Sequence, residues 1–240
     1  MKNKTKHEAL VSVIIPIHNI KKAEQCIKAL NQQTYKNIEI IPVDFKGFPA
    51  EKRNYGFRKS KGDFVLFLDE DEYLSPTAIE ECVKKAKENY DIIRIPVLKK
   101  IAKTYFAQCL SILRESTTKD LFFKRNVLDK IGLFDPSFIL CDDLDILERA
   151  RRAGFKFALV SKSYMIHDED LTLKSVIIKT FLARKGFRKL KDKYGEKVFK
   201  RIVKPTYHRM RIIKFLLKQP KYLLGIFLIM SLRFLIRRLP

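Results

Sequence analysis

The stretch KRNYGFRKSKGDFVLFLDEDEYLSP, residues 52–76, decides the fold. Its apolar centre, residues 64–68 (FVLFL), is short and uninterrupted, which is typical of a buried parallel strand. Residues 53–60 before it favour a helix, and residues 69–72 after it are four consecutive acids. Ser75 and Pro76 then predict a second helix, with Ser75 as its N-cap and Pro76 as its first residue. This order of helix, strand, acidic turn and helix indicates an α/β fold.

The same alternation extends on both sides of this stretch. Buried strands are predicted at residues 11–17 (VSVIIPI), 38–43 (IEIIPV) and 91–96 (DIIRIP), and a helix at residues 22–32. Further on, strands are expected at residues 121–124 and 155–160, and helices at residues 126–131 and 143–153. We therefore predict a three-layer α/β domain with a mainly parallel central sheet. Pro42 is awkward in this scheme, because proline cannot donate a ladder hydrogen bond in a central strand.

The composition fits a globular domain with an appendage. The chain has 240 residues, of which 46% are hydrophobic and 32% charged, and this excludes wholesale disorder. Its four cysteines are widely scattered and form no CxxC pair, so a zinc knuckle or a redox motif is not expected. A reducing compartment fits this cysteine usage best.

Positive charge is concentrated in the last third of the chain. The net charge is +23, and residues 161–240 alone hold 21 Lys or Arg against 5 Asp or Glu. From residue 171 the pattern is helical and basic, with breaks at Gly195, Pro205 and Pro220. We therefore expect basic amphipathic helices suited to an anionic membrane surface. Nucleic acid is not expected as a partner, because the chain carries no recognised nucleic-acid-binding signature.

An uncharged stretch near the C-terminus, residues 222–232 (YLLGIFLIMSL), sharpens the membrane prediction. A helix of this length covers roughly 16 Å, about half of a bilayer core of about 30 Å, so a full span is not expected. A helix lying in the membrane interface, flanked by Lys221 and Arg233, is favoured. The alternative is a helix that packs in the core of a larger assembly or forms a contact in a homo-oligomer. At the other end, residues 1–9 are interpreted as a flexible tail, because no small-residue cleavage site follows the apolar run.

Two acidic clusters carry the candidate chemistry. Residues 69–72 (DEDE) lie beyond the carboxyl end of a predicted strand, where open α/β sheets bind ligands. Four adjacent carboxylates favour a bound Mg²⁺ or Mn²⁺, and a solvated acidic turn is the alternative. In the second cluster, Asp142, Asp143 and Asp145 precede a predicted helix. Asp142 or Asp143 is expected either to cap that helix or to act as a general base.

In this order the pieces resemble the family 2 glycosyltransferases, which are inverting enzymes with the GT-A fold. The resemblance rests on four stretches: VSVIIPIHN, QQTYKNIEIIPVD, KRNYGFRKSKGDFVLFLDEDEYLSP and KRNVLDKIGLFDPSFILCDDLDILERARRAGFKF. They correspond to the family's opening strand, its second strand, its RNxG helix with the DxD strand, and its acceptor-side segment. The resemblance covers about residues 10–167, the predicted GT-A domain. Residues 168–240 are then a helical extension that associates with membranes or forms oligomers.

The resemblance implies a donor site for a nucleotide-diphosphate sugar of the UDP or GDP type. Pro16, His18 and Asp44 would line the nucleotide base and ribose. Arg53 would approach the base or the pyrophosphate, and Asp69 would contact the ribose or a metal ion. The stretch after Asp44 departs from the family, because FKGFPAEK is shorter than the usual Gly- and Ser-rich segment.

The resemblance also implies a metal site and a general base. Asp71 would coordinate the divalent ion together with Asp69. His167 would be a further metal ligand, as in some relatives, or a structural residue. Asp143 would deprotonate the acceptor hydroxyl, and Asp142 stands where the family often has Glu. The chain has no Trp, so acceptor stacking would involve Tyr or Phe.

The predicted function is inverting, metal-dependent transfer of a sugar from a nucleotide-diphosphate sugar to a hydroxyl of a lipid-linked glycan acceptor. The metal would neutralise charge on the leaving diphosphate, and no covalent enzyme intermediate is needed. Two alternatives stay open: transfer onto a polyprenyl phosphate, which requires no base, and a non-catalytic membrane-bound module that binds nucleotide sugars. The basic extension predicts a peripheral or monotopic protein at the cytoplasmic face of a membrane.

Overall fold

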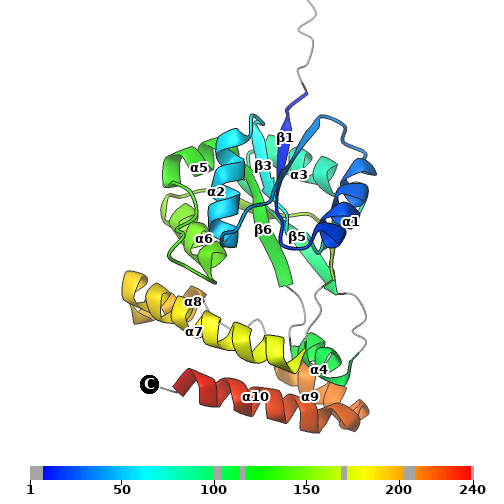
Figure 1. The fold of residues 1–240 in the computed structure, drawn as a ribbon, viewed down its shortest axis with the longest axis vertical. Coiled ribbons are helices and arrows are strands. Elements are labelled where there is room, and N and C mark those ends of the chain that lie inside the picture. Colours follow the sequence, from blue (N-terminus) through cyan, green and yellow to red (C-terminus); the bar gives the residue numbers. More distant parts are fainter. Residues whose placement is uncertain (1–7, 100–103, 114–116, 169–171, 203–208, 239–240) are drawn as a thin grey trace, which may run out of the picture.

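The computed structural model describes residues 8–99, 104–113, 117–168, 172–202 and 209–238. An α/β part is stacked on a layer of helices (Figure 1). The α/β part contains the strands β1 (Val11–Pro16), β2 (Ile38–Val43), β3 (Phe64–Phe67), β4 (Glu72–Leu74), β5 (Ile92–Lys99), β6 (Thr117–Lys124), β7 (Phe157–Leu159) and β8 (Met165–His167). Its helices are α1 (Ile20–Asn31), α2 (Pro49–Lys59), α3 (Ala78–Lys87), α5 (Arg125–Ile131) and α6 (Asp142–Arg152).

The strands form one sheet in the order β2-β1-β3-β6-β5-β8-β4, and β7 pairs with β5 beside this path. Among the described strands, β1 pairs in parallel with β2 and β3, and β5 with β7 and β8. The β3–β6, β5–β6 and β4–β8 pairings are antiparallel. Parallel pairings are thus the more frequent, but the sheet is mixed because β6 lies antiparallel between β3 and β5. Pro42 is accommodated because β2 is an edge strand.

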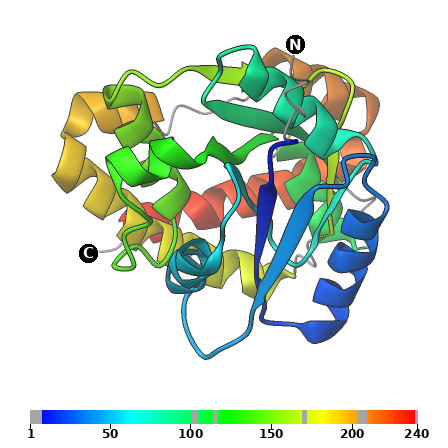
Figure 2. The same ribbon diagram turned by 90° about the horizontal axis from the view of Figure 1, so that it is seen from above.

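Helices cover both faces of the sheet, as the three-layer prediction requires. β1 is buried throughout, and its alternate side chains enter two different cores. Val11, Val13 and Ile15 pack with residues of α1 and α3, whereas Ile14 packs with residues of α2, α5 and α6. Figure 2 shows the sheet between these two groups of helices. The α/β class and the layer arrangement are therefore confirmed.

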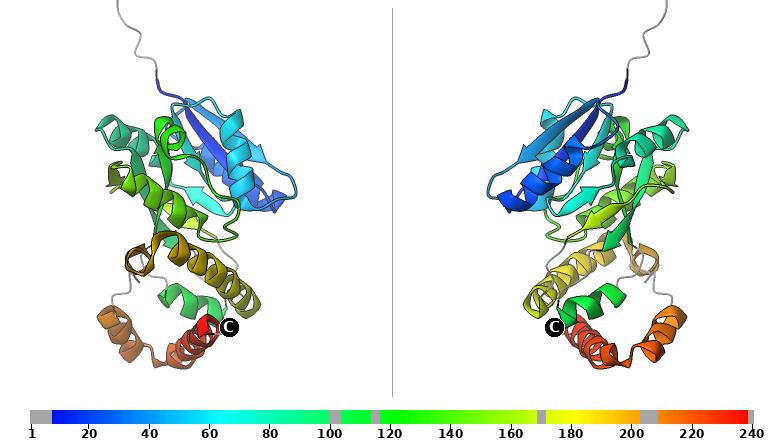
Figure 3. Two further views of the ribbon diagram at one scale, coloured as in Figure 1. Left: turned by 90° about the vertical axis from the view of Figure 1, so that its left-hand side faces the viewer. Right: turned by 90° about the vertical axis from the view of Figure 1, so that its right-hand side faces the viewer.

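The helical layer lies below the α/β part in the side views of Figure 3. It consists of α4 (Tyr105–Leu113), α7 (Leu173–Tyr194), α8 (Glu196–Ile202), α9 (Arg209–Lys218), a short 3-10 turn at Pro220–Tyr222, and α10 (Leu223–Arg238). Its small core joins Cys109 and Leu110 of α4 to Val176 of α7 and to Ile226 and Ile229 of α10. The sequence pattern did not predict α4, which leaves the α/β part between β5 and β6. None of the helices in the described ranges is both long and apolar enough to cross a bilayer.

The predicted start of one helix and the predicted N-cap of another are wrong. The helix after the acidic turn begins at Ala78 with Thr77 as its N-cap, not at Pro76 after Ser75. The Ser75 hydroxyl instead accepts a hydrogen bond from the backbone N–H of Tyr164 at 3.0 Å.

The second correction concerns the acidic cluster at α6. Neither Asp142 nor Asp143 caps this helix: the N-cap is Cys141, in the left-handed conformation with φ of +73°. Asp142 instead forms an ion pair with Arg53 of α2.

Candidate active site

The predicted donor residues follow the parallel strands at one edge of the sheet. Pro16 ends β1 and lies opposite Val43 in β2, so the loops carrying His18 and Asp44 leave the sheet side by side. Asp69 follows β3, the other neighbour of β1. This carboxyl edge of β1 and β3 faces the helical layer (Figure 1). Ligands of open α/β sheets bind at such an edge.

The four acids at residues 69–72 do not share one cation, because their carboxylates have different partners. Glu70 accepts hydrogen bonds from the backbone N–H groups of His18 and Asn19, the latter at 2.8 Å. Glu72 is buried and accepts one from the N–H of Asp69 at 2.8 Å. These two acids hold the turn and the loop after β1 in place. Asp69 and Asp71 are therefore the candidates for ligand contacts.

Arg53, on α2, joins the two acidic clusters. Its Nη2 pairs with Oδ1 of Asp69 and its Nη1 with Oδ2 of Asp142, both at 2.7 Å. The guanidinium is buried, and its Cζ lies 5.3 Å from the ring centroid of Phe134. Burial lowers the pKa of Arg53, but the carboxylates of Asp69 and Asp142 outweigh this effect and the pKa is raised overall. Arg53 therefore stays charged and links the end of β3 to the start of α6.

The rest of the RNxG motif also has a structural role. The Asn54 side chain donates to the carbonyl of Phe134 at 2.7 Å and accepts from its N–H at 3.0 Å, which fixes the acceptor-side loop. A Cβ at Gly56 would lie 2.3 Å from Cγ2 of Ile14 in β1. Only glycine allows α2 to lie this close to the sheet. Sequence reasoning gave Asn54 and Gly56 no role, although the motif itself contained the signal.

Lys52 is a second residue that sequence reasoning missed. Its side chain is buried, and its amine donates to the carbonyl of Ile17 and lies 3.2 Å from Nδ1 of His18. A buried ammonium needs such partners. It places a positive charge beside His18, in the loop predicted to face the nucleotide. Nothing in the sequence separates this lysine from the many exposed ones.

A metal ion would find two donor side chains where β4 begins and β8 ends, Asp71 and His167. The antiparallel pairing of β4 with β8 sets Glu72 opposite His167 and brings Nε2 of His167 to 3.4 Å from Oδ1 of Asp71. Asp69 is engaged with Arg53. Within the described residues, no group of three or more His, Cys, Asp or Glu side chains could hold a metal ion. One carboxylate with an imidazole nevertheless fits a divalent ion whose remaining ligands are phosphate oxygens and water.

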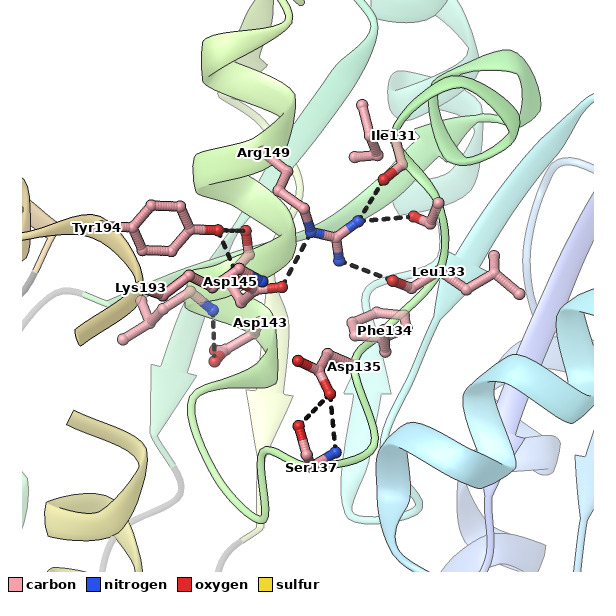
Figure 4. A network of polar contacts seen from close by, with 12 residues as sticks. Ile131, Leu133, Phe134, Asp135, Ser137, Asp143, Asp145, Arg149, Lys193 and Tyr194 are labelled. Atoms are coloured by element: carbon pink, nitrogen blue, oxygen red, sulfur yellow. Dashed lines mark hydrogen bonds and ion pairs between the residues drawn. The ribbon is translucent and has the colours of Figure 1, made fainter. Parts of the chain in front are cut away.

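The start of α6 presents one buried and one exposed carboxylate. Burial raises the pKa of the Asp142 carboxyl, and Arg53 opposes this effect. Asp143 is exposed, and its Oδ1 accepts a hydrogen bond from the N–H of Leu144 at 2.8 Å. Asp145, one turn further into the helix from Asp142, is fully buried in the polar network of Figure 4. Of these three acids, only Asp143 has an exposed side chain.

Comparison with protein families and curated proteins agrees with this arrangement. The model of the family described as glycosyl transferase family 2 matches residues 46–140. This stretch includes Arg53, Asp69 and Asp71 and ends just before Asp142. An uncharacterised glycosyltransferase of Haemophilus influenzae is 34% identical over 108 residues, which are 35% of this chain and 36% of that protein. The amylovoran biosynthesis glycosyltransferase AmsB of Erwinia amylovora is 23% identical over 205 residues, 63% of this chain and 67% of that protein.

Solved structures share the fold. The mannosyltransferase PcManGT from Pyrobaculum calidifontis, in complex with GDP-Man and Mn²⁺, matches with a TM-score of 0.59 and 15% identity over 94% of this chain and 75% of that chain. S. aureus TarS 1–349, in complex with UDP-GlcNAc, matches with a TM-score of 0.52 and 15% identity over 76% and 66%.

The fold is thus of the GT-A type, as predicted. The family model and these relatives likewise support the sequence-based assignment to the family 2 glycosyltransferases. The chain spans about a third of the length of the first relatives it matches, 36% in the Haemophilus protein and in GlyG of Streptococcus pneumoniae.

Proposed function

We propose that the protein transfers a sugar from a nucleotide-diphosphate sugar to an acceptor hydroxyl with inversion at the anomeric carbon. The observation that carries this proposal is the double ion pair of Arg53, which joins Asp69 on the donor side to Asp142 beside the exposed Asp143. In the reaction the acceptor oxygen bonds to the anomeric carbon, and the bond from that carbon to the diphosphate oxygen breaks. The nucleoside diphosphate leaves with the electron pair, and Asp143 takes the hydroxyl proton.

The donor site is proposed at the carboxyl edge of β1, β2 and β3. Pro16, His18 and Asp44 would line the base and ribose, while Arg53 and Asp69 would lie nearer the diphosphate. Structures of similar fold hold UDP, UDP-GlcNAc or GDP-Man, which supports a donor of the UDP or GDP type. The positive charge of buried Lys52 at this edge favours an anionic ligand.

Asp71 and His167, together with Asp69, are proposed to hold Mg²⁺ or Mn²⁺. When bound, such an ion supplies positive charge that stabilises the leaving diphosphate. The contact between Asp71 and His167 supports the assignment, as does the Mn²⁺ in the PcManGT complex.

A direct displacement is favoured over a covalent mechanism. Cys141 is the thiol closest in sequence to the proposed base, and burial, with the charges of Asp143 and Asp142, raises its pKa to about 12. A thiol with that pKa is almost entirely protonated near pH 7 and is a poor nucleophile.

The acceptor is proposed to be lipid-linked, because α10 offers a face suited to a membrane. The helix is apolar on nearly all sides, yet only Gly225, Ile226 and Ile229 are buried among its first eight residues. Its outer face consists of exposed Leu223, Leu224, Phe227, Leu228, Met230 and Leu235. A helix that is apolar on all sides is usually buried in a protein core or in a membrane.

The positive charge of the C-terminal segment distinguishes between the possible partners of this outer face. Residues 197–240 contain twelve Lys or Arg and no acid. A second copy of the chain would bring two such segments together without counter-charge, whereas anionic lipid neutralises them, at about 1 kcal/mol per Lys or Arg near the surface. We therefore propose an anionic membrane surface as the partner, with the protein peripheral or monotopic on the cytoplasmic side.

The donor proposal is tested by thermal unfolding with UDP, GDP, CDP and dTDP, with and without Mn²⁺. A nucleotide at 100 times its dissociation constant adds about 2.7 kcal/mol of stability. We expect a metal-dependent shift with UDP or GDP that Asp71→Ala removes and Asp129→Ala, an exposed acid on α5, retains. Absence of a shift with all four nucleotides would count against the donor site and favour a protein without transferase activity.

The base is tested with Asp143→Asn. A hydroxyl acceptor predicts a fall in kcat of about 10²–10⁴-fold with unchanged nucleotide binding. Full activity of the variant would instead indicate an acceptor that is already an anion, such as a polyprenyl phosphate.

The membrane proposal is tested by flotation with phosphatidylcholine vesicles, with or without phosphatidylglycerol. We expect binding only to the anionic vesicles, weakened by salt and by Phe227→Glu. Failure to bind them would overturn it, and dimers in sedimentation that Phe227→Glu dissociates would assign the outer face to a second copy.

A further inference from the structure

Helix α7 lies directly against the segment that carries the proposed base. It crosses between the α/β part and α10 (Figures 1 and 3). Although α7 belongs to the predicted C-terminal extension, its contacts reach from Asp135 to Asp145, on both sides of Asp143. These contacts are of two independent kinds, one steric and one polar.

The steric contact is at Gly186. A Cβ at this position would lie 2.4 Å from the carbonyl oxygen of Leu140 and 3.0 Å from Sγ of Cys141. The helix therefore rests on the backbone of residues 140–141, and only glycine permits it. Cys141 has φ of +73°, a conformation that residues with a Cβ adopt only where their surroundings impose it. Asp142 and Asp143 follow immediately, so the direction in which they leave this turn depends on Cys141.

The polar contacts lie at the C-terminal end of α7. The fully buried carboxylate of Asp145 accepts from Nζ of Lys193 at 2.6 Å and from the hydroxyl of Tyr194 at 2.7 Å (Figure 4). It also pairs with Arg149 at 2.9 Å, whose guanidinium donates to the carbonyls of Ile131, Gly132 and Leu133.

Lys189 completes this set of contacts. Its amine lies 3.3 Å from Oδ2 of Asp135 and 4.4 Å from the ring centroid of Phe138. Residues spaced along α7 thus hold the loop before α6 and the first turn of α6 itself.

We infer that α7 is a positioning element of the active site, with Gly186 and Tyr194 as its key positioning residues. It sets the Cys141 turn and thereby the place of Asp143 relative to the donor bound at Asp69. The inference rests on the proposed role of Asp143 as the base. It also implies that the catalytic unit extends beyond residue 167 to the end of α7. Misplacement of a reacting group by about 1 Å can cost about 10²-fold in rate.

A matched pair of glycine variants tests this inference. A Cβ at Gly225 in α10 would lie 2.6 Å from Sγ of Cys109, just as a Cβ at Gly186 would lie 3.0 Å from Sγ of Cys141. Each Gly→Ala change therefore overpacks a C-terminal helix against a cysteine, but only Gly186→Ala disturbs the turn before Asp143. The rate of nucleoside diphosphate release from UDP- and GDP-sugars, with water as acceptor, is measured for both.

We expect Gly186→Ala to lower kcat by about 10- to 100-fold with KM for the donor changed less than twofold, and Gly225→Ala to leave both unchanged. Tyr194→Phe, which removes one hydrogen bond to Asp145, should also lower kcat. This variant replaces Gly186→Ala in the test if Gly186→Ala does not fold. An unchanged kcat in the folded variants at positions 186 and 194 would overturn the inference.

Thiol labelling provides a readout that does not depend on activity. Peptide-resolved alkylation should accelerate at Cys141 in Gly186→Ala and at Cys109 in Gly225→Ala, because each displaced helix uncovers its own thiol. Unchanged labelling at Cys141 in Gly186→Ala would show that α7 does not hold the turn. If the wild-type protein neither releases nucleotide nor shows the thermal shift with UDP or GDP, the proposed function fails, and the labelling still decides whether α7 positions residues 141–143.

Discussion

Burial of the Asp142 carboxylate costs folding free energy, and its ion pair with Arg53 offsets this cost. Removing one member of a buried ion pair leaves the other without compensation, at a cost of about 3–5 kcal/mol. We expect Arg53→Ala to lower the free energy of unfolding by roughly this amount, measured in urea, and Arg53→Ala/Asp142→Asn to recover part of it because the unpaired charge is gone. If Arg53→Ala alone is as stable as the wild type, the double ion pair does not form in solution.

Glu39, on β2, is an acid outside the active site whose protonation should affect stability. Partial burial raises its pKa, but hydrogen bonds from the Ser12 hydroxyl at 2.5 Å and from the N–H groups of Lys61 and Gly62 lower it overall. Because the folded pKa is below the unfolded value, the stabilisation is complete above the unfolded pKa and is lost as the pH falls through the folded one.

We therefore expect Glu39→Gln to lower the Tm by about 2–4 °C at pH 7. The difference from the wild type should shrink in a series of buffers from pH 5 to pH 3. A difference that stays constant over this range would contradict the proposed protonation dependence, and Glu24→Gln, an exposed acid on α1, provides the control.

At the level of elements, α2 is positioned by the contact of Gly56 with β1. Alanine there improves helix propensity by about 1 kcal/mol but overpacks Ile14, which typically costs about 1–3 kcal/mol. We expect Gly56→Ala to be destabilised by up to about 2 kcal/mol in urea unfolding, the difference between these two effects. Ile14→Leu removes the Cγ2 atom, so the double variant should lose less than the sum of the two single changes. Simple additivity would show that the contact is not the cause.

The elements that could be predicted from sequence are those with a local pattern. Apolar runs indicated β1, β2 and β3, and Gly132 and Gly154, both with positive φ, marked the ends of α5 and α6. α4 lacked such a signal because only Gln108 and Ser111 interrupt its apolar sequence. β4 has only three residues and is held by its pairing with β8, which pairs in turn with β5. A strand this short depends on a partner that is distant in sequence, so no local pattern reveals it.

At the scale of the whole molecule, the outer face of α10 is expected to contribute to binding and not to folding. Leu224 is 67% exposed, whereas Ile229 on the same helix is fully buried. Leu224→Glu should change the free energy of unfolding by no more than about 0.5 kcal/mol while weakening vesicle binding. Ile229→Glu should unfold the helical layer, because it buries an unpaired carboxylate. Equal destabilisation by both changes, measured as Tm, would mean that the outer face is already covered.

The sequence by itself determined the α/β class, the family, and the residues that gather at the carboxyl edge of the parallel strands. It could do so because strand ends and their acids are adjacent in the chain. Only the tertiary structure decided which partner each acid has: Arg53 for Asp69 and Asp142, His167 for Asp71, and Lys193 with Tyr194 for Asp145. These partners are many residues apart, and folding sets their distances. The same reason explains why the close approach of α7 to the turn before Asp143 appears only in three dimensions.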